Sequence, residues 1–191
     1  PLRAFADRYA ADAADYGAEL RYAVDTHVHA DHVSGLRDVA DATGATPVMS
    51  ARAVERGVTF DVETVGDGDT LRIGETEVEV VATPGHTTGM VSLRVGDTLL
   101  TGDGLFARGV PRPDLQEGAE GAEEYARELH RTLTERLARF DDGTIVAPGH
   151  YTPGDAPSAD GSYTARLGDL RGSLSVFSED RETFVERVLA D

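Results

Sequence analysis

The segment at residues 26–35, THVHADHVSG, constrains this chain most, because it places three of its six histidines and one aspartate within six positions. These residues are His27, His29, Asp31 and His32. Imidazole and carboxylate groups are the side chains that bind transition metals. For one isolated His-x-His pair a polar surface loop is the better interpretation, so a metal site requires further ligands elsewhere in the chain.

Three more residues of the ligand type follow apolar runs that read as strands. His86 lies in TPGHTTG, Asp103 in LLTGDG and His150 in IVAPGH, whereas His130 lies within a helical pattern. Loops at strand ends carry function because the sheet beneath them holds their geometry. Such regular placement of His and Asp favours a metal site over a set of unrelated surface loops.

The rest of the chain predicts helices that alternate with strands and hairpins, because helical spacing and two-residue alternation of apolar residues succeed each other. We expect no division into separate domains, so that residues 1–191 form a single domain. A long surface loop is expected over 152–162. The expected helices cover 2–16, about 34–44, 122–140 and 180–191, the strands 20–24, 46–50 and 144–150, and the hairpins 69–83 and 90–103, which turn at Gly74-Glu75 and Gly96-Asp97.

Composition excludes several classes of function. A net charge of −17 argues against nucleic acid and anionic membranes as partners. Acidic residues spread along the whole chain are typical of the solvated surfaces of halophilic proteins. The chain has no cysteine, so disulfides, thiolate ligands and a cysteine nucleophile are excluded. No apolar run suggests a membrane span or a signal peptide, so we expect a cytoplasmic protein.

The ordered motifs His-x-His-x-Asp-His, Pro-Gly-His-Thr, Thr-Gly-Asp and Pro-Gly-His resemble those of the metallo-β-lactamase superfamily, from about residue 20 to 150. The resemblance implies an α/β fold, a four-layer αβ/βα sandwich with a metal site at one edge between two sheets. It implies one metal position formed by His27, His29 and His86, a second formed by Asp31, His32 and His150, and Asp103 as the bridge between them.

Two segments, HVHADHVSG and TGDGLFARGVPRPDLQ, resemble the persulfide dioxygenases within that superfamily, although Pro111 replaces their usual glycine. That resemblance implies one Fe(II) per chain on His27, His86 and Asp103, with two histidines and one carboxylate leaving positions open for O₂ and substrate. The substrate would be the persulfide of a small thiol such as glutathione, and sulfite and the free thiol would be the products.

Substrate contacts are expected on the loops that follow two of the predicted ligands. Arg108 and Arg112 lie within ten residues of Asp103, and an arginine fork can grip a substrate carboxylate with two hydrogen bonds. Tyr151, directly after His150, is a further candidate contact.

A thioester hydrolase of the glyoxalase II type is the alternative. There all seven ligands would hold two metals, zinc or a mixture of zinc and iron, and Asp31 and Asp103 would position the metals and the attacking hydroxide. The chain contains every ligand that both classes need, so the ligand set leaves both open. The arginine-containing loop after Asp103 favours the dioxygenase.

Relatives of this type begin with β-strands before the helix expected at residues 2–16. We therefore expect the first strands of the sheet to be missing from this chain. An open sheet edge is a liability that natural proteins cover. Alternatively, a homodimer partner covers that edge, or the ends of the chain are disordered.

Overall fold

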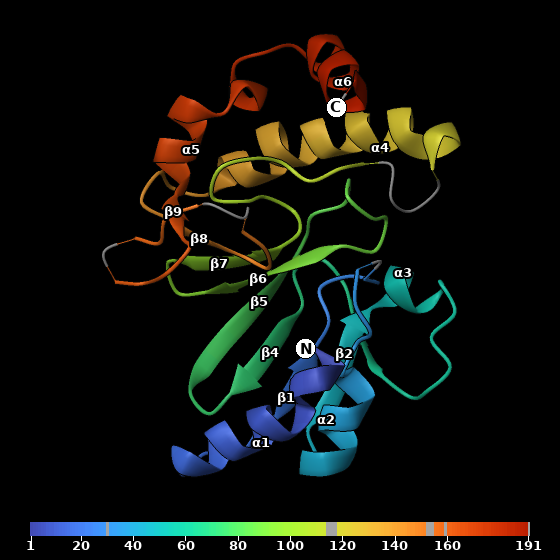
Figure 1. Ribbon diagram of the computed structural model, residues 1–191, viewed down its shortest axis with the longest axis vertical. Helices are drawn as coiled ribbons and strands as arrows, with labels where there is room; N and C mark the ends of the chain where they lie inside the picture. Colours follow the sequence, from blue (N-terminus) through green and yellow to red (C-terminus); the bar gives the residue numbers. More distant parts are fainter. Residues whose placement is uncertain (30, 114–117, 152–154, 159, 191) are drawn as a thin grey trace.

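The protein is described by a computed structural model that covers residues 1–191 except 30, 114–117, 152–154, 159 and 191. Two β-sheets pack face to face, and helices cover the outer face of each sheet (Figure 1). This order of helices, sheet, sheet and helices confirms the predicted α/β sandwich.

The smaller sheet is parallel throughout, with the strand order β1-β2-β3. Parallel neighbours need crossover connections, and α2 and α3 supply them. The helix α2 ends at Gly44, whose left-handed conformation (φ 74°) gives the predicted stop. The elements of this half are a 3₁₀ turn at Arg3–Phe5, α1 (Ala6–Asp15), β1 (Tyr22–Val24), α2 (Leu36–Thr43), β2 (Thr46–Ser50), α3 (Ala51–Val54) and β3 (Glu63–Val65).

The larger sheet has the order β4-β5-β6-β7-β8-β9 among the described residues. Both predicted hairpins are confirmed, since β4 pairs with β5 and β6 with β7 in antiparallel register. The strand β8 returns parallel to β7. The strands are β4 (Thr70–Ile73), β5 (Thr76–Ala82), β6 (Val91–Val95), β7 (Thr98–Gly102), β8 (Ile145–Pro148) and β9 (Ala165–Arg166).

Helices α4 (Ala119–Arg131) and α5 (Leu167–Ser173) lie over the larger sheet, and α6 (Arg181–Ala190) packs on α4 (Figure 1). The prediction of one helix over 122–140 is wrong in one respect. The α-helical geometry ends at Arg131, and π-helical and 3₁₀ turns continue to Arg139. The Thr134 hydroxyl donates to the His130 carbonyl four residues earlier, and such a bond disturbs a regular helix. No helix among the described residues has the length and apolar character to cross a bilayer.

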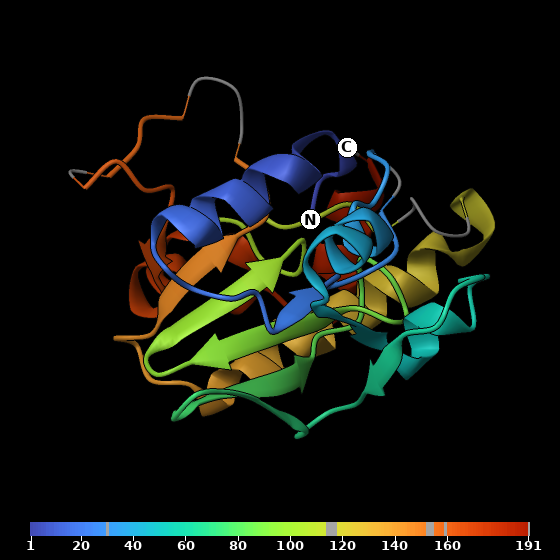
Figure 2. The ribbon, with the colours of Figure 1, turned by 90° about the horizontal axis from the view of Figure 1, so that it is seen from below.

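Three apolar cores separate the four layers. Leu36 lies in the core between the smaller sheet and its helices, Val80 between the two sheets, and Leu129 between the larger sheet and α4. In Figure 2, which views the molecule from below, α1 and α2 lie in front of the strands. Val80 and Val81 are neighbours on β5 but belong to different cores, as expected when successive side chains point to opposite faces.

The Pro84-Gly85 turn before His86 is pressed against α4. Gly85 has φ 140°, and a Cβ atom built there would lie 2.5 Å from the Leu129 Cα atom. The Thr132 hydroxyl, 2.6 Å from the Pro84 carbonyl oxygen, ties the same turn to the end of α4. Only glycine fits at this position, so the close approach fixes where His86 leaves the sheet.

We expect Gly85→Ala to lower the free energy of unfolding by about 2 kcal/mol or more, since it combines an unfavourable backbone angle with overpacking. The matched control is Gly143→Ala, where a Cβ atom would meet nothing within 4 Å. That control should be neutral or stabilise by up to about 1 kcal/mol. Chemical denaturation measures both, and equal stability of the two variants would contradict the close approach.

Candidate metal centre

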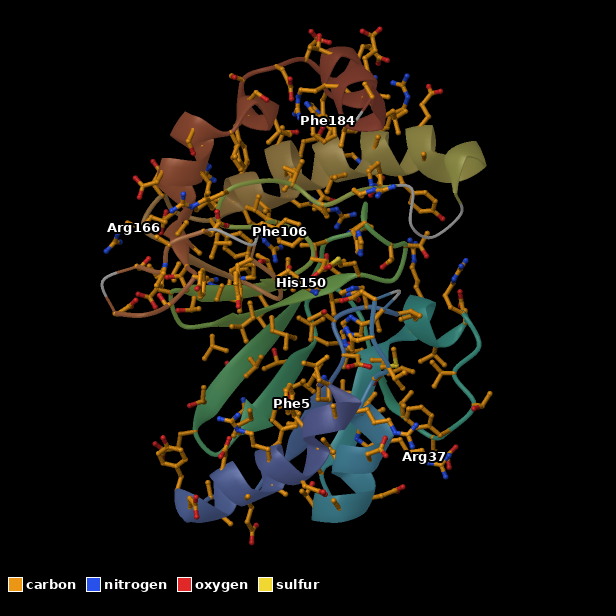
Figure 3. All side chains as sticks on the ribbon, in the orientation of Figure 1. Phe5, Arg37, Phe106, His150, Arg166 and Phe184 are labelled. Atoms are coloured by element: carbon orange, nitrogen blue, oxygen red, sulfur yellow. The ribbon has the colours of Figure 1, made fainter. Side chains whose placement is uncertain are left out.

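The predicted ligands gather where strands of the two sheets end at the middle of the molecule. Because β7 and β8 are parallel neighbours, Asp103 and His150 leave the larger sheet at the same edge. Figure 3 shows His150 at the junction between the two halves of the sandwich. The other ligands arrive from the loop between β1 and α2 (His27, His29, Asp31 and His32) and from the turn between β5 and β6 (His86).

Three of the predicted ligands form a buried triad, His27, His86 and Asp103, with exposed fractions of 1%, 5% and 8%. The Nε2 atoms of His27 and His86 lie 3.9 and 3.8 Å from the Asp103 Oδ2 atom. These distances are too long for hydrogen bonds. They suit ligands of one ion, because two atoms that each lie about 2 Å from a metal are separated by roughly 3–4 Å.

The triad fits a metal cofactor by its own chemistry. The Nε2 atom of His27 is buried and has no hydrogen-bond partner among the described residues. Burial and the neighbouring imidazoles of His29 and His86 lower the pKa of His27 to about 3, so its ring is neutral and keeps a lone pair. An unsatisfied buried nitrogen is costly, and a cation held between His27, His86 and Asp103 would satisfy it.

The remaining nitrogens of both triad histidines are held by groups that the sequence did not reveal. The Nδ1–H of His86 donates to the Arg112 backbone carbonyl at 2.9 Å. A carbonyl oxygen only accepts, so the proton lies on Nδ1 and Nε2 is left for a metal. The Nδ1 atom of His27 lies 2.9 Å from the Thr26 hydroxyl. Thr26 directly precedes His27 in the sequence, and that adjacency is the only signal that could have pointed to it.

His29, Asp31 and His32 form a second, more exposed group in which each offers an atom within 4.8 Å of the others. His32 Nδ1 lies 3.2 Å from Asp31 Oδ1. The two ring nitrogens of His150 reach Asp31 at 2.9 Å and Asp103 at 2.7 Å. Asp31, His32 and His150 therefore satisfy one another, whereas the Nδ1 atom of His29 is buried without a hydrogen-bond partner among the described residues.

Electrostatics strengthens the links between His150 and its two carboxylates. Partial burial disfavours the charged ring, but the hydrogen bonds and charges of Asp103 and Asp31 outweigh it and raise the pKa of His150. Burial also disfavours the Asp31 carboxylate, yet hydrogen bonds from His32 and His150 lower its pKa to about 2. His150 thus tends to carry a proton on each nitrogen and Asp31 to remain charged.

His29 lies beside the triad without joining it. Its ring centroid is 4.1 Å from that of His27, but its Nε2 atom lies 3.7 Å from the Asp25 carboxylate. Asp25 is buried and accepts a hydrogen bond from Ser34 Oγ at 2.5 Å, and Ser34 accepts from the backbone N–H of Leu36 at the start of α2. This chain of contacts, which sequence reasoning missed, ties the histidine loop to α2.

A cavity of about 570 Å³ opens beside His150, within the range of roughly 300–1,000 Å³ of small-molecule pockets. Of the predicted substrate contacts, Arg108 and Tyr151 line it, whereas Arg112 is not among its lining residues. Tyr151 stacks on Tyr163, with ring centroids 4.0 Å apart. The Phe106 ring lies edge-on to that of His150, with centroids 6.4 Å apart (Figure 3). Sequence reasoning missed Phe106, Asp155 and Tyr163 as lining residues.

The chain belongs to the metallo-beta-lactamase superfamily, whose family model matches residues 4–150. Among its relatives, the mitochondrial persulfide dioxygenase ETHE1 of Mus musculus is 34% identical over 141 residues, which are 71% of this chain and 51% of the relative. The crystal structure of ETHE1 from Myxococcus xanthus superposes with a TM-score of 0.85 at 32% identity, over 99% of this chain and 77% of that one.

A hydroxyacylglutathione hydrolase of Cereibacter sphaeroides is 35% identical over 127 residues, 65% of this chain and 46% of the relative. The chain therefore spans about half the length of these curated relatives. The similar proteins are metalloenzymes, and both functional classes expected from the sequence are represented among them.

We expect His27→Gln to lose most of its metal on dialysis, because a ligand itself is removed. Removal of only a ligand's hydrogen-bond partner already lowers metal affinity by roughly 10–100-fold. His32→Gln should retain metal at the level of the unaltered protein, because His32 lies outside the buried triad. Elemental analysis measures both variants, with His130→Gln on α4 as a control away from the site. Equal metal loss in His27→Gln and His32→Gln would contradict the division into two groups.

Proposed function

We propose that this chain is an iron-dependent dioxygenase that oxidises the persulfide of a small thiol to sulfite. The observation that carries the proposal is the buried triad of His27, His86 and Asp103, which is separate from the less buried group of His29, Asp31 and His32. Two histidines and one carboxylate with open positions are the ligand set of non-haem Fe(II) oxygenases. The similarity to ETHE1 over 71% of the chain supports the same function.

His27, His86 and Asp103 would hold the metal, and bound Fe(II) would supply the activation of O₂. Persulfide, O₂ and water together yield the free thiol and sulfite, so the sulfur atoms come from the substrate, as the absence of cysteine requires. Thr26 and the Arg112 carbonyl orient the two imidazoles. The cavity next to His150 would bind the thiol, whose apolar portion can pack against Phe106.

The proton on His150 has a defined place in this arrangement. His150 lines the cavity and hydrogen-bonds to Asp103 and Asp31 with its two nitrogens. Both nitrogens are thereby engaged by carboxylates, and His150 would orient the Asp103 carboxylate toward the triad. His150 would transfer a proton to the departing thiolate only by giving up its hydrogen bond to Asp31, the longer of the two.

A glyoxalase II type of thioester hydrolase is the second candidate, supported by the complete set of seven ligands and by the similarity to hydroxyacylglutathione hydrolase. In that case two zinc or iron ions would be held, with Asp31 and Asp103 positioning them and the nucleophile. The grouping of His27 and His86 with Asp103 but without His29, and the hydrogen bonds of His150 to Asp31 and Asp103, favour the dioxygenase over this hydrolase.

After anaerobic loading with Fe(II), the protein should consume one O₂ for each sulfite released from glutathione persulfide. Oxygen-electrode and sulfite measurements test this, and Asp103→Asn should abolish both signals because it weakens the triad. Hydrolysis of a glutathione thioester without any O₂ uptake would assign the chain to the hydrolases instead.

We expect one metal ion per chain in protein that was never exposed to added metal. Zinc acquired from an expression host can occupy the same ligands, so the count is more informative than the identity of the metal. Elemental analysis against amino-acid quantification gives the ratio. A reproducible ratio of two would favour the hydrolase.

A further inference from the structure

The cavity beside His150 carries both signs of charge on its wall. Arg108 and Asp155 face each other there, with 3.6 Å between Arg108 Nε and Asp155 Oδ1, and Asp169 lines the same cavity. We propose that Arg108 and Asp155 form a two-charge clamp that selects thiols ending in an α-amino acid. The ligand's carboxylate would bind Arg108 and its ammonium group Asp155; only the thiol nature of the ligand rests on the proposed function.

The ion pair between Arg108 and Asp155 is loose and accessible. Its distance of 3.6 Å exceeds the roughly 2.7–2.9 Å of charge-assisted hydrogen bonds. The Arg108 side chain is 61% exposed, whereas that of Asp155 is 18% exposed. An ion pair with one exposed partner is weakened by solvent, and ion pairs at the surface stabilise a fold by only about 0–1 kcal/mol. A ligand that carries both charges can therefore enter between the two side chains at little cost in stability.

The balance of charge favours a zwitterion over a simple anion. Among the described residues that line the cavity, Arg108 is the one arginine, and it is accompanied by two carboxylates, Asp155 and Asp169. His150 also lines the cavity, but its two nitrogens are already matched by Asp31 and Asp103. A ligand end with a carboxylate alone would be repelled by both aspartates, and an amine alone would leave Arg108 unmatched. Attraction between unlike charges raises the affinity for one ligand, and repulsion between like charges excludes another, so both contribute to selectivity. A ligand with an adjacent ammonium and carboxylate group satisfies both Asp155 and Arg108.

The rest of the cavity suits such a ligand and connects the clamp to the metal centre. The stacked rings of Tyr151 and Tyr163 form part of the wall, and tyrosine faces attract ammonium groups. His150, which lines the same cavity, contacts Asp103 of the buried triad at 2.7 Å. A thiol whose amino-acid end is held by the clamp can therefore direct its sulfur toward the metal. Cysteine and the γ-glutamyl end of glutathione share this chemistry.

Four probes that can be neither oxidised as persulfides nor hydrolysed as thioesters test the clamp: S-methylcysteine, S-methylglutathione and the N-acetyl form of each. Isothermal titration of the metal-loaded protein should show the N-acetyl forms binding roughly tenfold more weakly, since one charge-assisted hydrogen bond is lost. Asp155→Asn should remove that difference, and Arg108→Gln should weaken the free-amine probes.

Matched controls carry the same change of charge elsewhere. Glu75→Gln lies at the turn between β4 and β5, and Arg37→Gln lies on α2, far from His150 in Figure 3. Both should bind all four probes like the unaltered protein. If S-methylcysteine binds tenfold more tightly than its N-acetyl form, a single amino acid is enough to occupy the clamp. If only S-methylglutathione binds, the clamp recognises the γ-glutamyl end of glutathione.

Equal binding of free and acetylated probes would overturn the clamp, as would discrimination that persists in Asp155→Asn. Failure of both free-amine probes to bind would overturn it as well. Because the probes do not react, discrimination by a protein without O₂ uptake would reject the dioxygenase and leave the clamp standing. O₂ uptake by a protein that does not discriminate between the probes would support the dioxygenase and reject the clamp.

Discussion

The convergence of His27, His86 and Asp103 on one buried point is the constraint on which the rest of the structure depends. Buried polar groups are costly unless they are paired or bind a metal. These three come from the ends of β1, β5 and β7, which belong to two different sheets. The apolar core between the sheets holds those strand ends together. The Gly85 turn, pressed against α4, then places His86 opposite His27.

Burial divides seven chemically similar ligands into two groups with different requirements. His27 Nε2 has no protein partner among the described residues, so the triad needs a cation. His150 instead shares its two nitrogens between Asp31 and Asp103, and His32 contacts Asp31. Those hydrogen bonds compensate the Asp31 carboxylate without a second ion. This asymmetry is the physical basis of the proposed mononuclear site, and it places a proton-bearing histidine between the metal centre and the cavity.

The sequence predicted those elements whose signals are local. Alternating residues with a glycine at the turn were sufficient for both hairpins, and Gly44 was sufficient for the end of α2. The strands β3 and β9 were missed because neither shows an apolar period: only Val65 is buried in β3, and β9 has two residues. The ligand residues were recognisable because each follows an apolar strand.

Relations between distant segments lay beyond the sequence. His86 and the Arg112 carbonyl are 26 positions apart, and no residue type announces a backbone contact. Arg112 was expected to bind substrate through its side chain, and that role stays a prediction. Likewise, the exposure that separates His27 from His32 depends on how the two sheets pack. The pairing of Arg108 with Asp155 depends on a loop whose path no local pattern predicts.

A crystal structure of the iron-loaded protein, with diffraction recorded on both sides of the iron absorption edge, tests the central claim most directly. The anomalous difference map should show one strong peak per chain, in contact with His27 Nε2, His86 Nε2 and the Asp103 carboxylate. His150 should still be hydrogen-bonded to Asp31 in that structure. A second peak of similar height among Asp31, His32 and His150, or a single peak there in place of the triad, would contradict the account.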